Sequence, residues 1–369
     1  MAIPTHFSQE ILDEIVGHLH DDRRTLKTLS ITSSTFLPIS REFLFDSISL
    51  RSTRCARWHD RLRDSPILRQ TIGMVELYIG DLLDTDKEHI TFILDSLSNP
   101  KRIGIRNRIS LPISWEQMHP WLRTAIIKVM DKPTVHTVVV ERCSDIPISF
   151  FSGTTHLQNI IFFQSGFTPN PERTPSDPLT PKIPVRGLYL SGGHYIRREY
   201  YDFVDHPEFP VDLGNLSRLQ VDLLQDNGGK VQHILSVCGQ SLHNLALNLK
   251  GGSASLQHLP ALRVLQFWLW TSHIHSLHPM VVGLLSTLES LRTSDNHHYY
   301  LREISIIIYI EPERCVEIPA IDLWSDLDSV FANISVDRVR IHTVSGFPPD
   351  WTSLLPNLHK SGRGGLDVQ

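Results

Sequence analysis

The sequence predicts an α/β protein in which a small N-terminal unit of three helices precedes a long, irregular array of short strands and helices. Three observations predict this fold. Apolar side chains recur at helical spacing near the N-terminus, one apolar triplet recurs along the rest of the chain, and several gaps between triplets hold amphipathic segments. We therefore expect two domains, at residues 1–48 and 49–369.

The composition is that of an ordinary globular protein. Of the 369 residues, 41% are hydrophobic and 20% are charged. The formal net charge is -5 and Lys and Arg form no runs, so we do not expect nucleic acid as a partner. The longest apolar stretch, Ile304–Ile310, is far shorter than the roughly 18 residues that cross a bilayer, so we expect no membrane partner.

The N-terminus and the cysteines indicate a reducing compartment. Residues 1–9 lack the basic and apolar regions of a signal peptide. The four cysteines lie too far apart for a compact disulfide framework or a zinc pair; they are Cys55, Cys143, Cys238 and Cys315. We expect a cytoplasmic or nuclear protein.

The three N-terminal helices follow from apolar spacing and from capping residues. The first segment places five apolar side chains on one helical face, namely Ile11, Leu12, Ile15, Val16 and Leu19. We expect Ser8 to cap this helix, Asp22 to cap the second, and Pro38 to lie in the first turn of the third. Such a small core needs a partner or the following domain to cover its apolar surface.

This N-terminal segment resembles the F-box motif. Residues of FSQEILDEIVGHLHDDRRTLKTLSITSSTFLPISREFLF occupy its opening, its helix and its aromatic position; these are Phe7, Ser8, Glu10, Ile11, Ile15, Leu19 and Phe36. The sequence departs from the motif where Ser8 replaces the usual Pro, Thr32-Ser33 a Val-Cys type pair, and Phe36 the usual Trp. The stretches LFDSISL and LRDSPILRQTIGMVELYI resemble the large fungal F-box family, in which a leucine-rich-repeat-like domain fills the rest of the chain. The alternative is a plain three-helix cap on a repeat domain.

The resemblance implies docking to the small adaptor that links F-box proteins to a cullin. The side chains expected to insert into the adaptor are Phe7, Ile11, Leu12, Ile15, Leu19, Leu37, Ile39 and Phe43. A few such anchors dominate the energy of a protein interface.

The remainder of the chain repeats the pattern apolar-x-x-apolar-x-apolar. The copies are Ile72/Val75/Leu77, Pro100/Ile103/Ile105, Val135/Val138/Val140, Leu157/Ile160/Phe162, Val185/Leu188/Leu190, Leu216/Leu219/Val221, Leu242/Leu245/Leu247, Leu262/Leu265/Phe267, Leu301/Ile304/Ile306 and Val336/Val339/Ile341. Plausible helices occupy five of the gaps, at Asp86–Leu97, Trp115–Met130, Val231–Cys238, Pro279–Leu291 and Leu323–Ala332.

A short strand followed by a helix in each repeating unit is the arrangement of a leucine-rich repeat, in which stacked units share one continuous core. Repeat lengths are ragged and the usual Asn or Cys is mostly missing, so we expect an irregular, divergent solenoid. A doubly wound sheet is the alternative, weakened by the lack of a Gly-rich strand–helix turn. The proline density of residues 165–184 predicts an exposed loop inside one repeat.

We found no pattern that predicts catalysis. Gly228-Gly229-Lys230 lacks the other residues of a phosphate-binding loop, and is better interpreted as a turn before a helix. His273, His275 and His278 lack a further ligand nearby, so we attribute their clustering to chance. We assign no catalytic residue, no metal and no cofactor.

In a leucine-rich repeat, side chains between the core positions face the concave surface. Here these are Met74, Glu76, Tyr189, Arg218, Gln220, Asp222, Asn244, Asn248, Gln266, Trp268, Arg338 and Arg340, together with Trp270. Aromatic and Arg side chains are favoured as anchors for a protein ligand, and Trp268 and Trp270 are the most conspicuous. Packing of these Trp residues under loops or helices is the alternative.

The resemblance thus implies a substrate-recognition subunit of a cullin–RING ubiquitin ligase. Its F-box would bind the adaptor, and its repeats would hold an unknown target protein. The subunit itself would be non-catalytic and would contribute proximity. Two alternatives are a repeat-based interaction scaffold that never engages a ligase, and a hydrolase or transferase hidden among the α/β repeats.

Overall fold

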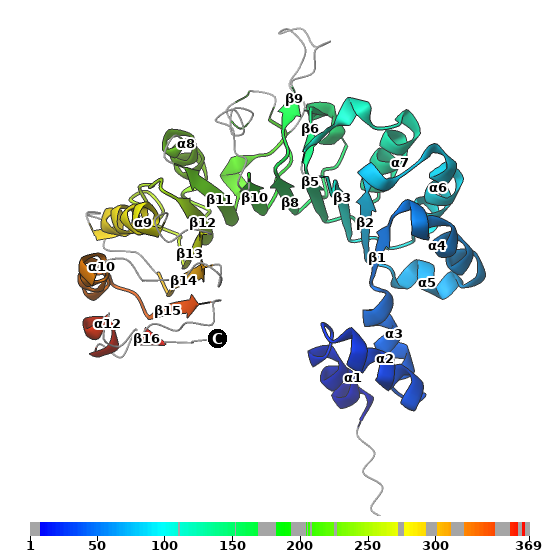
Figure 1. Cartoon of the computed structure of the whole chain (residues 1–369), viewed down its shortest axis with the longest axis horizontal. Helices are drawn as coiled ribbons and strands as arrows, with labels where there is room; N and C mark the ends of the chain where they lie inside the picture. Colours follow the sequence, from blue (N-terminus) through cyan, green and yellow to red (C-terminus); the bar gives the residue numbers. More distant parts are fainter. Residues whose placement is uncertain are drawn as a thin grey trace, which may run out of the picture. The chain divides into compact units, whose positions relative to one another are not determined.

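The structure is a computed structural model. It describes residues 8–109, 111–151, 153–168, 182–192, 204, 206, 209–224, 227–271, 277–292, 301–310, 321–343, 355–360 and 364–365. The chain divides into two compact units, residues 1–146 and 147–369. Each unit is α/β, with parallel strands that carry helices along one of their faces (Figure 1). The predicted α/β class is therefore confirmed.

The first unit begins with the three helices that the sequence predicts, α1 (Gln9–His18), α2 (Arg23–Thr32) and α3 (Leu37–Phe45). The Asp22 carboxylate accepts hydrogen bonds from the backbone N–H groups of Arg24, at 3.1 Å, and Thr25, at 3.0 Å, so the predicted cap of α2 is confirmed.

The predicted Ser8 cap is wrong. Ser8 occupies the position before α1 but accepts no capping hydrogen bond. Its side chain interacts with Glu10 instead, which diverts it from the free N–H groups of the first turn.

A small core holds these helices together. It consists of the buried side chains of Val16, Leu26 and Leu44. Six partly buried side chains pack around it, namely Leu19, Leu29, Phe36, Ile39, Phe43 and Phe45. Three fully or nearly buried residues are few for an independent core, as expected from the size of the helices.

The first unit continues with parallel strands in the order β1-β2-β3-β5. Their bounds are β1 (Ser47–Leu50), β2 (Met74–Tyr78), β3 (Arg102–Arg106) and β5 (Thr137–Glu141). The helices between them are α4 (Ser52–Asp64), α5 (Pro66–Thr71), α6 (Lys87–Ser96) and α7 (Pro120–Met130). The short strands β4 (Ile113–Ser114) and β6 (Cys143–Ser144) pair separately.

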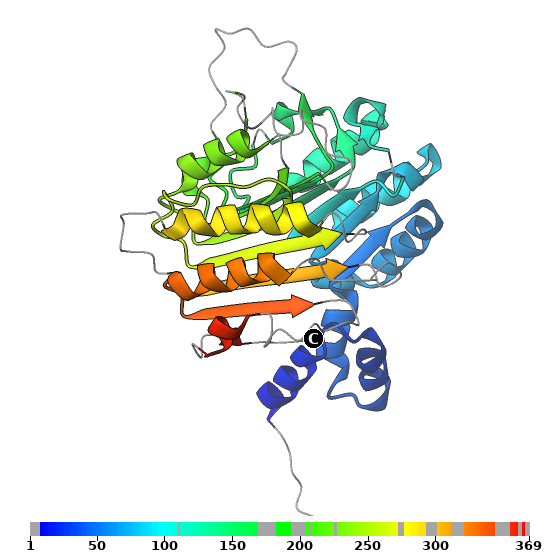
Figure 2. The same ribbon diagram turned by 60° about the vertical axis from the view of Figure 1, so that its left-hand side comes forward.

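The second unit carries a longer run of parallel strands. These are β8 (Asn159–Phe163), β10 (Gly187–Ser191), β11 (Arg218–Leu224), β12 (Asn244–Lys250), β13 (Val264–Thr271), β14 (Glu303–Ile310), β15 (Arg338–Thr343) and β16 (Gly364–Gly365), in that order. Its helices are α8 (Gly228–Cys238), α9 (Leu277–Arg292), α10 (Ile321–Asn333) and α12 (Pro356–Lys360). Figure 2 shows α9 and α10 lying along neighbouring strands of this sheet.

The apolar triplets line up across the strands. In the second unit the central residues pair in register in the order Ile160, Leu188, Leu219, Leu245, Leu265, Ile304 and Val339. In the first unit Val75 pairs with Ile103, which pairs with Val138. All these central residues are buried, so each of the ten predicted triplets marks a strand whose apolar side is covered.

The sequence prediction missed one copy. Phe45, Ile48 and Leu50 follow the same pattern, and β1 pairs with β2 through Ile48 and Val75. Its first residue, Phe45, is also the last residue of α3, so the sequence pattern there indicates a helix rather than a strand.

The five predicted helices are all present. Helix α8 begins at Gly228, three residues before the predicted start, so Gly228 and Gly229 belong to its first turn. Between β12 and β13, where the structure describes every residue, no helix forms, and the chain runs extended from Gly252 to Leu256. This segment lies so close to α9 that a Cβ on Gly283 would meet the backbone oxygen of Gly252.

Part of the predicted proline-rich loop pairs with neighbouring segments. Phe167–Thr168 forms the short strand β9, and Ile183 forms a parallel bridge with Val211. Residues 169–181 lie outside the described residues. Strand β7 (Ile146–Pro147) is equally short.

Candidate docking surfaces

One flank of α1 presents apolar side chains to solvent. Ile11 is 45% exposed and Ile15 is 47% exposed, whereas Val16 on the neighbouring face is fully buried. Both isoleucines come from the apolar stripe that the sequence predicts. The stripe is wider than the face that α2 and α3 cover, so part of it stays in contact with water.

The other predicted adaptor-binding residues are only partly accessible. Leu12, Leu19, Leu37, Ile39 and Phe43 are half-buried. Of these, Leu19, Ile39 and Phe43 pack against the small core described above. Phe7 lies outside the described residues. The structure therefore leaves Ile11 and Ile15 as the most accessible apolar groups of the predicted set.

An open groove of about 580 Å³ lies beside α1 and α3. Its lining residues are Gln9, Asp13, Ser34, Thr35, Pro38, Ile39 and Glu42. Gln9 Nε2 donates to Asp13 Oδ1 at 2.7 Å, one helical turn away. The carboxylates of Asp13 and Glu42 give this groove an acidic rim. The backbone N–H of Glu10, and then the Ser8 side chain, hold the pKa of the nearby Glu10 carboxyl below its usual value.

The strands of the first unit carry an ionic network on the face opposite the triplets. Arg106 donates through its two Nη atoms to Glu76 and to Glu141, each at 2.8 Å. The Arg51 guanidinium lies 4.3 Å above the Tyr78 ring. Burial, with a contribution from Arg106, lowers the pKa of Arg102.

Sequence reasoning identified Met74 and Glu76 on this face but missed Arg51, Arg102, Arg106 and Glu141. The alternation of strand side chains was sufficient to find the last three, because they occupy the same outward positions of β3 and β5. The pairing of Arg106 with both glutamates depends on neighbouring strands and was not visible in the sequence.

We call the face of β10–β15 opposite the triplets the second-unit open face. Its residues are Gly187, Tyr189, Ser191, Arg218, Gln220, Asp222, Leu224, Asn244, Ala246, Asn248, Lys250, Val264, Gln266, Trp268, Trp270, Glu303, Ser305, Ile307, Tyr309, Arg338, Arg340 and His342. In Figure 1 the helices α8, α9, α10 and α12 lie along the other side of these strands. All nine predicted target-binding residues lie on this face, namely Tyr189, Arg218, Gln220, Asn244, Gln266, Trp268, Trp270, Arg338 and Arg340.

Asp222 belongs to a network of hydrogen bonds and an ion pair within the protein, at one end of this face. Its fully buried carboxylate accepts from the Gly192 backbone N–H at 2.9 Å and from Asn248 Nδ2 at 2.6 Å. Lys250 Nζ lies 3.3 Å away and Ser191 Oγ lies 3.2 Å away. These contacts tie together the carboxyl-terminal ends of three neighbouring strands, so we assign Asp222 a structural role.

An aromatic patch lies beside this network on β13 and β14. We define it as Trp268, Trp270 and Tyr309. The ring centroids of Trp270 and Tyr309 are 4.8 Å apart, and Trp270 is 52% exposed. The Trp268 indole N–H is buried and has no hydrogen-bond acceptor in the described part of the chain. Trp268 is therefore half-buried in the sheet face, whereas Trp270 remains exposed.

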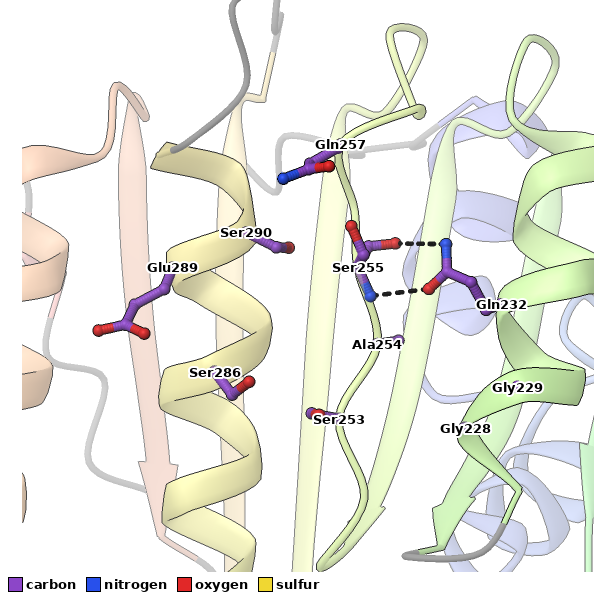
Figure 3. A pocket seen from close by; sticks show the side chains of 10 residues that line it. All are labelled: Gly228, Gly229, Gln232, Ser253, Ala254, Ser255, Gln257, Ser286, Glu289 and Ser290. Atoms are coloured by element: carbon purple, nitrogen blue, oxygen red, sulfur yellow. Dashed lines mark hydrogen bonds between the residues drawn. The ribbon is translucent and has the colours of Figure 1, made fainter.

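A second groove, of about 550 Å³, lies between α8 and α9 on the helical side (Figure 3). The extended segment through Ser255 forms its floor, and Gln232 bonds the Ser255 backbone as both donor, at 3.1 Å, and acceptor, at 2.8 Å. Glu289 is the one ionisable side chain among the ten described residues that line it. This groove offers hydroxyl and amide groups rather than an acid–base pair.

The described cysteines are buried thiols. Burial raises the pKa of Cys55, Cys143 and Cys238 to about 12, so these side chains stay protonated at neutral pH. In the described part of the chain no group of three or more His, Cys, Asp and Glu side chains could hold a metal ion. Two of the three clustered histidines, His273 and His275, lie outside the described residues.

Among the described residues no helix combines the length and apolarity that a membrane span needs. No protein-family model matches this chain, and no curated protein sequence matches it either.

Proposed function

We propose that this protein is the substrate-recognition subunit of a cullin–RING ubiquitin ligase. In this proposal α1–α3 form an F-box that docks to the adaptor, and the strands and helices that follow form a divergent leucine-rich-repeat-like domain that holds a target protein. The observation that carries the proposal is the exposure of Ile11 and Ile15 on a helix whose unit resembles an F-box.

Two physical arguments support the docking step. Exposed branched apolar side chains on a short amphipathic helix gain favourable free energy when a partner removes them from water. The helical core has few members, so association also stabilises the unit itself.

The repeat arrangement supports the second half of the proposal. Parallel strands in register, with the described helices of the second unit along one side, leave the other strand face available for a partner. That face carries Trp270 and several Arg side chains, the residue types that most often anchor protein interfaces. The subunit would bring target and ubiquitin-loaded enzyme together, and would carry out no bond chemistry itself.

Capture of the purified cullin-ligase adaptor by the full-length protein tests the proposal. We expect the double variant Ile11→Asp/Ile15→Asp to lose capture, because it places two charges in an apolar contact. Arg57→Asp, an exposed substitution on α4, is the matched control and should capture the adaptor as the unaltered chain does.

Circular dichroism separates lost docking from lost folding. Both isoleucines are about half exposed, so the double variant should keep its helical signal, whereas Val16→Asp should unfold the helical unit. Equal capture by the double variant and the unaltered chain would contradict the proposed docking surface. The strand-and-helix domain would then be left as a binding scaffold without a ligase.

A further inference from the structure

We propose that the second-unit open face binds an extended, acidic segment of the target protein, with an apolar side chain of that segment seated on the aromatic patch. This inference rests on the proposed function, because it specifies the chemistry of the target that the repeats hold. Three independent features of the face carry it.

The first feature is the aromatic patch. Trp270 keeps 52% of its surface exposed although Tyr309 packs beside it. In the strand register Trp268 and Ile307 are neighbours, which extends the apolar area toward the middle of the sheet. Such an exposed aromatic area surrounded by polar residues is typical of the centre of a protein interface.

The second feature is charge. The open face carries four basic and two acidic residues, a net charge of +2, whereas the whole chain has a net charge of -5. Lys250 is paired with Asp222 at 3.3 Å and Arg340 with Glu303 at 3.6 Å. Arg218 and Arg338 are exposed and form no ion pair with a described residue. Carboxylates of a partner complement these two guanidinium groups.

The third feature is a set of amide side chains. Gln220, Asn244 and Gln266 lie on the consecutive strands β11, β12 and β13, beginning with the strand that carries Arg218, and are half-buried. Their side chains form no hydrogen bond with another described residue. A primary amide both donates and accepts, so it matches the N–H and C=O groups of an extended peptide backbone.

Single-stranded nucleic acid is the competing polyanion. The two arginines without an ion pair to a described residue lie on β11 and β15, four strand spacings or roughly 19 Å apart, so they do not form a continuous phosphate track. The amides and the single aromatic patch between them fit a peptide with one apolar anchor better than a series of stacked bases.

Fluorescence anisotropy with a labelled copolymer of glutamate and tyrosine tests the inference on the full-length protein. We expect binding that weakens with salt. Polyglutamate, which lacks the anchor, should bind about tenfold more weakly, and a copolymer of lysine and tyrosine should not bind.

Two variants act on separate features. Trp270→Ala and Arg218→Glu/Arg338→Glu should each weaken binding about tenfold, and the second should also reduce the salt dependence. Arg54→Glu/Arg57→Glu, at two exposed positions of α4 in the first unit, is the charge-matched control and should bind as the unaltered chain does. Unchanged binding by both variants overturns the inference, and so does tighter binding of labelled polyuridylate than of the glutamate–tyrosine copolymer.

The same variants distinguish this inference from the proposed function. Adaptor capture depends on α1, so Trp270→Ala and Arg218→Glu/Arg338→Glu should capture the adaptor normally. If both variants bind the glutamate–tyrosine copolymer as the unaltered chain does, while the unaltered chain captures the adaptor, the inference alone is refuted. Failure of adaptor capture by the unaltered chain, with copolymer binding intact, would refute the ligase role and leave the binding face standing.

Discussion

Replacing Asp222 by Ala should strongly destabilise the second unit. The fully buried carboxylate accepts from the Gly192 N–H and from Asn248, and pairs with Lys250, which is 21% exposed. Leaving a buried donor unsatisfied costs about 1–3 kcal/mol, and breaking a buried ion pair costs about 3–5 kcal/mol. Lys250 and Asn248 can turn partly toward water, whereas the Gly192 N–H cannot, so we expect a loss of about 3–4 kcal/mol.

Urea unfolding, followed by tryptophan fluorescence and far-ultraviolet circular dichroism, measures this loss. Lys250→Met leaves the other donors on Asp222 and should cost about 1 kcal/mol. Asp212→Ala, which removes a carboxylate that accepts from the Gly214 N–H at 3.0 Å at a more accessible site, should also cost about 1 kcal/mol. A loss below about 1 kcal/mol for Asp222→Ala would refute the assignment of Asp222 as the residue that ties the three strand ends together.

Three further predictions follow from burial. Leu265→Ala should lower the free energy of unfolding in urea by about 2–5 kcal/mol, and Gln266→Ala by about 0.5 kcal/mol or less. Equal losses for the two variants would contradict the assignment of Leu265 to the buried face of β13 and Gln266 to the opposite face. Gly283→Ala should lower the melting temperature, because its Cβ would meet the Gly252 backbone oxygen, whereas Gly229→Ala, with open space around it, should leave the temperature unchanged or raise it. The three described cysteines, whose pKa burial raises from 9.0 to about 12, should resist alkylation at pH 8 when peptides are mapped. The pKa of these thiols is higher in the folded than in the unfolded chain, so their contribution to stability is complete below pH 9.0 and falls as the pH rises toward 12. Urea midpoints that rise over this pH interval would contradict the burial of the three thiols.

Local patterns in the sequence predicted much of the secondary structure. Asp22 and Pro38 mark helix starts because their side chains act on their own first turn. The triplets predicted strands because three apolar residues at that spacing suit a strand with one buried side. Helix α4 was not predicted, because it has few apolar residues. Only Cys55 and Leu62 of this helix are buried, and two residues form no recognisable apolar stripe.

The candidate surfaces divide in the same way. Alternation along the strands was sufficient to place Trp270 and Arg338 on one face of the sheet. It did not show that the carboxylates of Glu76 and Asp222 bind side chains on neighbouring strands. Nor did it show that Leu19 and Phe43 pack inward while Ile11 and Ile15 remain exposed.

By itself, the sequence determined which segments become helices or strands and which side of each strand is apolar, because those properties depend on residues a few positions apart. Only the tertiary structure decided which polar groups pair, how α9 approaches the Gly252 segment, and which apolar side chains of α1 stay accessible. These outcomes depend on residues that are distant in the chain and adjacent in space, so a local pattern carries no information about them.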